Sequence, residues 1–437
     1  MKPMVRRRAL APIAALALVV LAWIVLIHSS ILQNNAFTFL RGERSKAARS
    51  LRFHPVKDSK NGTSYVFMSQ IQDTNRTGVP EFFYFNTSAS SRVLCFRGNS
   101  TRDGTKNLYA FAEQHVPGDA LLLPGTTLVS DSHFDFANPW HSMYNLIQFV
   151  HWRMDSRCQR SDRMLIFHRG EIRHDLGAWI RSVLDSNGVT TGVDTMRYHP
   201  EGRVVCFQRA VVSRRGIGGV SGAVLRDLFE QVRCRTRQWC GVGSGVNDDD
   251  TTVRVALVAR ERGRAFVNLS DWKHAVKLVC EVRPHCQWSV VWFSALDFCS
   301  QVKLMSTTDI LVSVHGAQLT NMIFMNPGSR ILEAFPQGWL QLAGNGQFIY
   351  KHLADWAGLG HEGYWRDGGT AKCPMDSSSP GQCFSLHYKN KPVGINSTFI
   401  VKWLAEVLSN FSCTARASLT KQECKCSVEP GADDRLS

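Results

Sequence analysis

The chain has 437 residues and a mass of 49.0 kDa, which suits two domains and excludes a peptide hormone or a single small module. Hydrophobic residues make up 44% of the chain and charged residues 20%, so it can bury large cores and is predicted to be globular. The net charge of +15 favours an anionic ligand. Because the basic residues are scattered and form no long run, we expect a phosphate-bearing small molecule and no nucleic acid.

The N-terminus predicts a membrane anchor. Residues 9–27 carry no charge and follow three arginines, and their length is about that needed to cross ~30 Å of hydrocarbon. The arginines favour a cytosolic N-terminus. We therefore expect a cytosolic tail and signal-anchor transmembrane helix over 1–28 and a luminal stem over 29–60, as in a single-pass type II protein of the Golgi or endoplasmic reticulum. A cleaved signal peptide is the alternative, and it also leads to the secretory pathway.

Glycosylation motifs favour the same compartment. Asn-x-Ser/Thr sequons begin at Asn61, Asn75, Asn86, Asn99, Asn268, Asn396 and Asn410. Their number is more than ordinary Ser and Thr usage would produce, so we expect glycans on this luminal part.

The thirteen cysteines also indicate an oxidising compartment, because none has the paired spacing of a zinc site. Candidates for disulfides that staple loops are the close pairs Cys234/Cys240 and Cys373/Cys383 and the tail group Cys413, Cys424 and Cys426. The connectivity stays open, and an odd number leaves at least one thiol free or intermolecular.

Strand and helix patterns alternate along the luminal part, which is typical of an α/β fold. In its first half, apolar runs predict strands over 120–123, 164–168 and 204–212, and helical spacing predicts helices over 140–152 and 172–184. The Gly- and Asp-rich segment after Cys240 has no apolar periodicity, so we place a domain boundary there. The predicted domains are 61–245 and 246–410, followed by a Cys-containing tail over 411–437.

The second domain has the more regular pattern. Strands are predicted over 252–259, 288–293, 310–314 and 331–335, with a helix capped by Ser270 and further helices over 298–305 and 319–324. Continuous apolar strands that alternate with helices indicate a parallel sheet covered on both faces.

A candidate anion site follows the strand over 310–314. The strand ends at His315, and Gly316 and Ala317 lead directly into a helix, whose free N–H groups and positive dipole end would face a ligand above the sheet. Ligands of open parallel sheets bind beyond the carboxyl ends of the strands. A packed βαβ unit with a buried histidine is the alternative.

The run HGAQLTNMIFMNPGSRILEAFP, which starts at His315, resembles the signature of glycosyltransferase family 61. Gln301, Asp309 and the segment from Tyr350 to Leu359 are also similar. The resemblance extends from about residue 120 to 360. It implies two Rossmann-like domains with parallel sheets (the GT-B architecture) and inverting transfer of a sugar from a UDP-sugar to a glycan or glycoprotein, with no cofactor and no divalent metal required.

The resemblance also implies the donor-binding residues. Arg260, Arg264 and Asn268 are similar to an arginine-rich turn that lies over the nucleotide diphosphate, where a guanidinium fork binds phosphoryl oxygens and stabilises the leaving group. Other predicted donor-binding residues are His315, Gly316, Ala317, Asn321 and Glu333, the last through ribose or sugar hydroxyls. Asn268 also begins a sequon, and a glycan there would contradict a buried role.

In the first domain, Asn138 and His141 resemble the Asn-x-x-His of the family, at the start of a helix. Both are candidate catalytic residues, and His141 is the candidate base, because the ordinary pKa of histidine is near 6.5. The acid that the family has four residues later is replaced by Asn145. Asp131 and Asp135 are the alternative candidates for the base.

Three questions stay open in the sequence. Asp248, Asp249 and Asp250 contain a DxD pattern, but they lie in the polar interdomain segment and are interpreted as solvated, so no metal site is predicted. The donor sugar can be xylose, N-acetylglucosamine or arabinose. The rival interpretations are a catalytically inactive, lectin-like protein of the same fold and a basic domain that binds sulfated polysaccharide.

Overall fold

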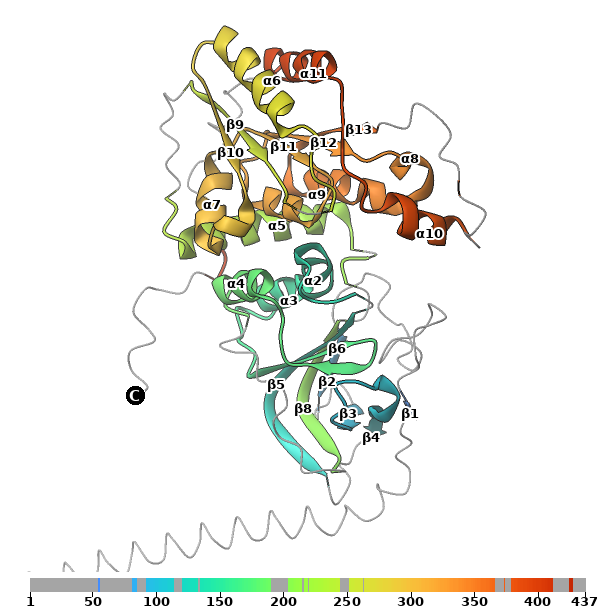
Figure 1. Ribbon diagram of the computed structural model, residues 1–437. Helices are drawn as coiled ribbons and strands as arrows, with labels where there is room; N and C mark the ends of the chain where they lie inside the picture. The colour runs from blue at the N-terminus through green and yellow to red at the C-terminus, as the bar shows by residue number, and fades with distance from the viewer. Residues whose placement is uncertain are drawn as a thin grey trace, which may run out of the picture.

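The computed structural model describes residues 54–55, 81–84, 92–113, 120–132, 134–189, 203–213, 216–218, 220–243, 251–261, 263–365, 373, 379–411 and 424–426. They form two sheets with helices between them and a second helical layer over the sheet of the C-terminal half (Figure 1). The predicted membrane anchor over 1–28 lies outside these ranges. Among the helices within them, none is both long and apolar enough to cross a bilayer.

The sheet of the N-terminal half is mixed. Its strands are β1 His54–Pro55, β2 Glu81–Tyr84, β3 Arg92–Arg97, β4 Leu108–Glu113, β5 Leu121–Ser132, β6 Arg163–His168, β7 Glu171–Arg173 and β8 Val205–Ser213. The order is β1-β4-β3-β8-β5-β6-β7, and β2 also pairs with β8. Among the described strands of this sheet, only the pairs β5–β6 and β5–β8 are parallel. The prediction of a parallel sheet is therefore confirmed in this half only for β8-β5-β6. The other pairs are antiparallel, and short connections such as the one between β3 and β4 permit only that pairing.

Three helices cover this sheet on the side of the C-terminal half: α2 Pro139–Leu146, α3 Gln148–Asp155 and α4 Ala178–Ser186. The helix predicted over 172–184 is wrong in its first part. Arg169 and Gly170 both have positive φ and form a tight turn, so β7 folds back onto β6 as a hairpin. The helix begins only after Gly177, which also has a positive φ.

The sheet of the C-terminal half is fully parallel, as predicted. Its strands are β9 Val253–Val258, β10 Cys286–Val291, β11 Ile310–Val314, β12 Arg330–Phe335 and β13 Gly360–Trp365, in the order β10-β9-β11-β12-β13. Every residue of β11 is buried, because helices cover both faces of the sheet.

The α-helices from residue 222 onward are α5 Gly222–Trp239, α6 Leu269–Val282, α7 Phe298–Thr307, α8 Trp339–Leu342, α9 Ile349–Ala357, α10 Pro380–Cys383 and α11 Ser397–Ser409. The helix expected after Gly316 is a 3-10 helix, η4 Ala317–Phe324. The other short helices are η2 Gly104–Lys106, η3 Phe293–Ala295, η5 Gly344–Phe348 and the π-helical η6 Phe384–Tyr388. Ser270 lies inside α6, and Asn268 is its N-cap, so the predicted cap is wrong by two residues.

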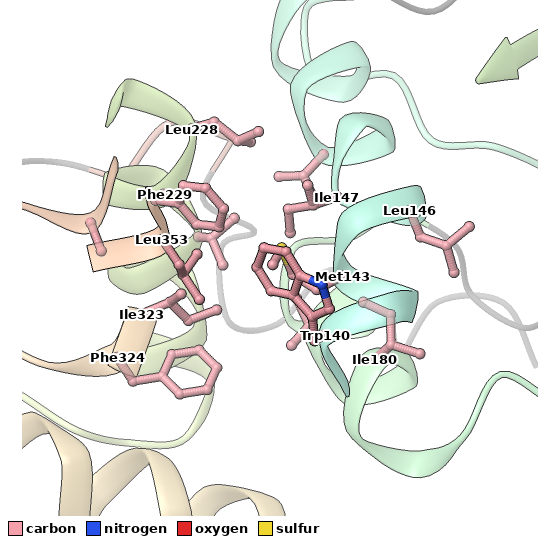
Figure 2. Close-up of a cluster of buried hydrophobic side chains, with 14 of the residues drawn as sticks. Trp140, Met143, Leu146, Ile147, Ile180, Leu228, Phe229, Ile323, Phe324 and Leu353 are labelled. Atoms are coloured by element: carbon pink, nitrogen blue, oxygen red, sulfur yellow. The ribbon is translucent and has the colours of Figure 1, made fainter. Parts of the chain in front are cut away.

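One hydrophobic cluster joins the two halves (Figure 2). Trp140, Met143 and Ile147 of the N-terminal half face Phe229 of α5 and Leu353 of α9, and all five side chains are buried. Helix α5 thus packs against both halves. The predicted boundary at 245 and 246 falls in 244–250, outside the described residues, and stays a prediction.

Six disulfides join cysteines of the described ranges: Cys95–Cys206, Cys158–Cys426, Cys234–Cys424, Cys240–Cys299, Cys280–Cys286 and Cys373–Cys383. The predicted pair Cys373/Cys383 is confirmed. The pair Cys234/Cys240 is wrong, because Cys234 faces the C-terminal tail and Cys240 faces α7 from the end of α5. Cys413 lies outside the described residues.

The sequon asparagines within the described ranges are exposed: Asn99, Asn268, Asn396 and Asn410. Asn396 caps α11 by accepting a hydrogen bond from the Thr398 N–H. Asn61, Asn75 and Asn86 lie outside these ranges. Glycosylation needs an accessible side chain, which all four visible sites have, and the glycans themselves stay a prediction.

Candidate functional site

The two arginines predicted to bind the donor follow β9 at the carboxyl edge of the parallel sheet. The Arg264 guanidinium lies over the Trp339 ring at 5.1 Å, and its Nη1 donates to the Lys389 carbonyl at 3.3 Å. The buried Nη1 of Arg260 and Nε of Arg264 have no hydrogen-bond partner within the described part of the chain. Buried N–H groups normally have partners, so these two are suited to an anionic ligand.

Gly316 leaves the space that Arg260 occupies. A Cβ at this position would overlap the Arg260 Nη1 and the Gln318 Oε1. The φ of Gly316 is 165°, which is extended backbone open to any residue, so a larger residue here would displace the ends of the Arg260 and Gln318 side chains without straining the backbone. Gly316 and Arg260, from two neighbouring strands, are thereby brought together as the sequence predicts.

A segment near the C-terminus holds the arginine loop in place. Val393 N–H donates to the Ala265 carbonyl and Val267 N–H donates to the Val393 carbonyl, each at 2.8 Å. With the Lys389 carbonyl on Arg264, this segment fixes the loop at several points. Sequence reasoning missed these groups, because backbone carbonyls leave no trace in a pattern of side chains.

His315, Glu333 and His361 form a buried hydrogen-bonded trio below the arginines. His315 Nδ1 lies 2.5 Å from Glu333 Oε1, and His361 Nε2 lies 2.7 Å from Glu333 Oε2. The Glu333 side chain is 0% exposed. His361 was missed by the sequence analysis, because it lies in β13, whose sequence GHEGYW has no apolar run.

Aromatic rings surround His315. Its ring centroid lies 4.1 Å from that of Trp339, 5.1 Å from that of Phe335 and 5.1 Å from that of Tyr350. The rings exclude water from the His315–Glu333 pair, which strengthens its electrostatic interaction. Burial also raises the pKa of the Tyr350 hydroxyl, and the Glu333 charge raises it further.

The charges of the site follow from this burial. Burial lowers the pKa of His315 by more than Glu333 raises it, so the imidazole is neutral near pH 7. Burial alone would raise the pKa of Glu333, but the interactions with His315 and His361 bring it below its ordinary value, and the carboxylate is ionised. Burial and the Arg260 charge lower the pKa of Arg264 to about 10, which leaves it cationic.

In the N-terminal half, Asn138 and His141 stand at the start of α2. The Asn138 Oδ1 accepts hydrogen bonds from the backbone N–H groups of Trp140 at 3.0 Å and His141 at 3.4 Å, which is the N-cap arrangement. The His141 ring stacks on Phe134 with 4.4 Å between centroids. Phe134 is 52% exposed, so an aromatic side chain borders the candidate base on the surface.

Asn145 has a role of its own in α2. Its Nδ2 donates to the His141 carbonyl at 2.7 Å and to Ser132 Oγ at 3.1 Å. An ionised carboxylate at this position could not donate either bond. The replacement of the family's acid is therefore matched to its surroundings.

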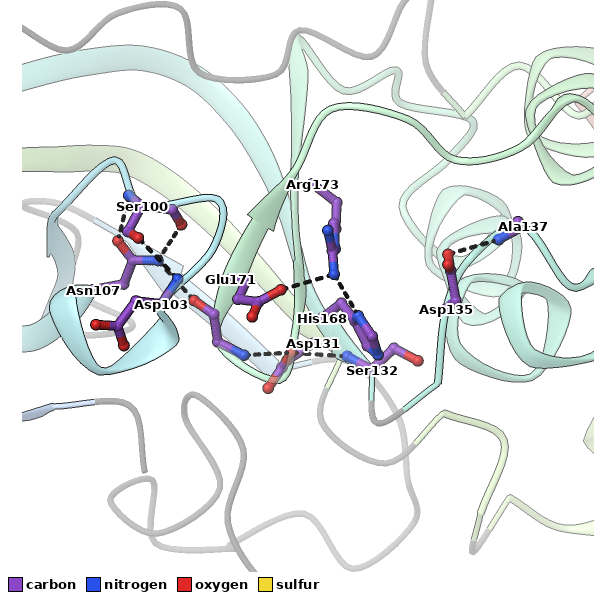
Figure 3. A network of polar contacts seen from close by, with 11 residues as sticks. Ser100, Asp103, Asn107, Asp131, Ser132, Asp135, Ala137, His168, Glu171 and Arg173 are labelled. Atoms are coloured by element: carbon purple, nitrogen blue, oxygen red, sulfur yellow. Dashed lines mark hydrogen bonds and ion pairs between the residues drawn. The ribbon is translucent and has the colours of Figure 1, made fainter. Parts of the chain in front are cut away.

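The alternative bases, Asp131 and Asp135, belong to a polar network at the ends of β5 and β6 (Figure 3). Asp131 is buried, and its Oδ1 accepts from the backbone N–H groups of Ser132 and Gly170. Asp135 is exposed and accepts from the Ala137 N–H at 3.1 Å. Both carboxylates thus accept hydrogen bonds from backbone N–H groups and stabilise the local backbone conformation.

Of the remaining predicted donor-binding residues, Asn321 lies at the junction of the halves. Its Oδ1 accepts from Trp179 Nε1 of α4 at 2.9 Å, and its Nδ2 donates to the Gln318 carbonyl at 3.3 Å. Asn268 is exposed, and its side chain bonds to Asp271. The structure therefore groups Arg260, Arg264, His315 and Gly316 and leaves these two apart.

The DxD segment over 248–250 lies outside the described residues. Within them, no group of three or more His, Cys, Asp or Glu side chains is arranged to hold a metal ion.

Residues 140–332 match the family model described as Glycosyltransferase 61. The matched region covers less than half of the chain. It includes His141, Arg260, Arg264 and Gly316, and it ends one residue before Glu333. No curated protein matches the chain.

Proposed function

We propose that the chain is an inverting transferase for a UDP-sugar, on the premise of the match of residues 140–332 to glycosyltransferase family 61. The acceptor is a glycan or glycoprotein, and the transferred sugar is xylose, N-acetylglucosamine or arabinose. The observation that carries the proposal is the pair of cationic side chains, Arg260 and Arg264, with unpartnered buried N–H groups beside Gly316. This arrangement suits a diphosphate at the carboxyl edge of a parallel sheet.

The reaction needs two kinds of help from the protein. The acceptor oxygen forms a bond to the anomeric carbon while the bond from that carbon to the diphosphate oxygen breaks, so negative charge grows on UDP and the acceptor hydroxyl loses a proton. Arg260 and Arg264 stabilise the charge, since both remain cationic, and Arg264 is held in place by Trp339 and the Lys389 carbonyl before the ligand arrives.

His141 takes the proton in this proposal. Its backbone position is fixed by the Asn138 cap, and Phe134 packs against its ring. The exposed part of Phe134 gives an acceptor sugar an apolar surface on which to stack. Asn138 supports His141 through the backbone, as the N-cap of α2.

The proposed location is the lumen of the Golgi or endoplasmic reticulum, with the chain anchored through residues 1–28. Six disulfides and the exposure of the four visible sequon asparagines support an oxidising, glycosylating compartment. Protease protection of microsomes, followed by endoglycosidase, tests the location. Cleavage of the main part of the chain in intact vesicles would exclude it.

A panel of UDP-sugars tests the activity. The full chain in detergent is heated with each nucleotide, where a ligand at 100 times its Kd adds about 2.7 kcal/mol to the free energy of unfolding. The stabilising donor is then incubated with glycan acceptors, and release of UDP is measured. A lectin-like protein would bind glycans without releasing UDP, and this result would overturn the proposal.

The proposed mechanism uses no divalent metal, because arginines take the role of a cation at the diphosphate. Turnover is therefore expected to persist in EDTA. A complete loss that Mn²⁺ restores would instead assign Asp248 or Asp250 to the site.

A further inference from the structure

Glu333 is closed off from a ligand by burial. Its side chain is fully enclosed, and each carboxylate oxygen accepts a hydrogen bond from a histidine, Oε1 from His315 at 2.5 Å and Oε2 from His361 at 2.7 Å. A direct bond from Glu333 to a ribose or sugar hydroxyl would require the side chains that enclose it to move. The polar group that meets the donor in this part of the site must therefore be another one.

The two contacts fix the proton positions of both histidines. Glu333 is ionised and accepts only, so His315 holds its proton on Nδ1 and His361 holds its proton on Nε2. In neutral His315 this leaves a lone pair on Nε2. Among the described residues, the structure shows no hydrogen bond at that nitrogen.

The position of His315 limits what its Nε2 can meet. His315 directly precedes Gly316, whose open side is occupied by the Arg260 guanidinium, so the imidazole lies next to the proposed diphosphate position. The moieties adjacent to a diphosphate in a UDP-sugar are the ribose and the transferred sugar. Both present hydroxyl groups, and a hydroxyl donates a hydrogen bond to an imidazole lone pair.

We propose that Glu333 and His361 are positioning residues that hold His315 so that its Nε2 accepts a hydrogen bond from a hydroxyl of the donor. This inference rests on the proposed function, since it needs a UDP-sugar beside Arg260 and Arg264. It assigns His361, which lies outside the matched region, to the donor site.

Two histidines and a carboxylate can also bind a metal ion. Here the ring nitrogens face the carboxylate oxygens at hydrogen-bond distances, so these atoms already satisfy one another. We therefore interpret the three side chains as a hydrogen-bonded group without a metal ion. If EDTA changed the nucleotide affinity of the wild type but not of a His361 variant, this assignment would be wrong.

Two pairs of variants separate the role of the His315 Nε2 from that of His361, which supports it through Glu333. His315→Asn keeps an amide N–H for Glu333 and removes the Nε2 lone pair, while His315→Gln retains a polar group farther out. His361→Ala removes the donor to Glu333, and His361→Gln can restore it through an amide N–H. Unfolding curves identify the variants that fold, and only those are compared.

The measured quantities are the affinities for UDP, for 2′-deoxy- and 3′-deoxy-UDP and for the active UDP-sugar, by calorimetry. If the ribose supplies the hydroxyl, the wild type prefers UDP to one deoxy analogue by about 3- to 10-fold, and this ratio falls to near one in His315→Asn and His361→Ala. If the transferred sugar supplies it, the ratio of UDP-sugar to UDP affinity falls by a similar factor. His361→Gln recovers most of the lost ratio.

If both affinity ratios were unchanged in folded His315→Asn and His361→Ala, the inference would be wrong, and His315, Glu333 and His361 would have a structural role only. Failure of the proposed function has a different signature, because the wild type would then bind neither UDP nor any UDP-sugar.

Discussion

Trp140 of α2 packs edge-on against Tyr350 of α9, with 5.6 Å between the ring centroids. Tyr350 in turn contacts the His315 ring, so one aromatic path joins the helix that carries His141 to the site that carries the arginines. Trp140 is 9% exposed and belongs to the hydrophobic cluster that joins the halves. The relative position of base and leaving-group site therefore depends on side-chain packing as well as on the backbone.

Loss of either arginine should slow transfer strongly. Arg260→Ala or Arg264→Ala removes a charged donor at the proposed diphosphate position, and by analogy with oxyanion donors it should cost roughly 3 to 4 kcal/mol of transition-state stabilisation. Steady-state kinetics with the active UDP-sugar measure this as kcat/KM. Arg226→Ala, on the exposed side of α5, is the matched control and should behave as wild type. Rates within twofold of wild type for both site variants would place this loop outside the site.

His141→Ala should lower kcat by about 100- to 10,000-fold and leave the affinity for UDP nearly unchanged, since a general base acts on the acceptor. The acidic limb of the pH profile should change as well. Kinetics and UDP calorimetry on the same preparation separate the two effects. His352→Ala, an exposed histidine on α9, is the control. Weakened UDP binding would assign His141 to the donor site. Unaltered turnover would show that His141 is part of α2 without a role in catalysis.

Phe134 is expected to affect the acceptor and not the donor. Phe134→Ala removes the ring that stacks on His141 and that is 52% exposed. We expect the KM for a glycan acceptor to rise by about 2- to 13-fold, the range for loss of one aromatic contact of about 0.5 to 1.5 kcal/mol. Phe134→Tyr keeps the ring and should retain most of the activity. A change confined to the KM of the UDP-sugar would contradict the acceptor role.

The free energy of unfolding should fall in mild acid partly because of His315. Burial lowers the pKa of this histidine below its ordinary 6.5, so at lower pH the unfolded chain binds the proton more readily than the native chain. The resulting loss begins as the pH falls through about 6.5 and amounts to at most about 1.4 kcal/mol per pH unit. Denaturant titrations of wild type and His315→Asn from about pH 7.5 to 5.5 test this. Equal pH dependence in both proteins would refute it.

The two disulfides of the tail should stabilise the protein more than the local one does. Cys158–Cys426 and Cys234–Cys424 join residues 268 and 190 positions apart, whereas Cys373–Cys383 spans 10. In the chain-entropy account, removing one long-range link costs roughly 5 kcal/mol and removing the short one about 3. Serine variants of each set, compared by thermal unfolding, measure the difference. Equal losses would show that the tail links do not constrain the unfolded chain.

The parallel sheet could be predicted from sequence because each strand there is a continuous apolar run between helices. The strand over 310–314 was predicted with its observed bounds, and that over 331–335 is one residue short at its start. The mixed sheet could not be predicted in the same way, since β8 pairs with three strands from distant parts of the chain. Local periodicity holds no information about such partners.

Part of the candidate site could also be predicted from the sequence, and part could not. Arg260 and Gly316 each follow a parallel strand, and the carboxyl ends of such strands meet at one edge, so their proximity could be expected. His361 could not be found this way, because it lies inside β13, a strand without an apolar run. The engagement of Asn321 with Trp179 depends on how the two halves pack, which no local pattern shows.

The tail disulfides also set the order in which the protein can be completed during synthesis. Cys424 and Cys426 lie close to the end of the chain, yet their partners are Cys234 on α5 and Cys158 after α3. Because chains are made from the N-terminus, both partners are present as thiols long before the tail arrives. In a chain that stops before residue 424, Cys158 and Cys234 therefore lack their disulfide partners. Their free thiols distinguish a truncated chain from a complete one by thiol reactivity.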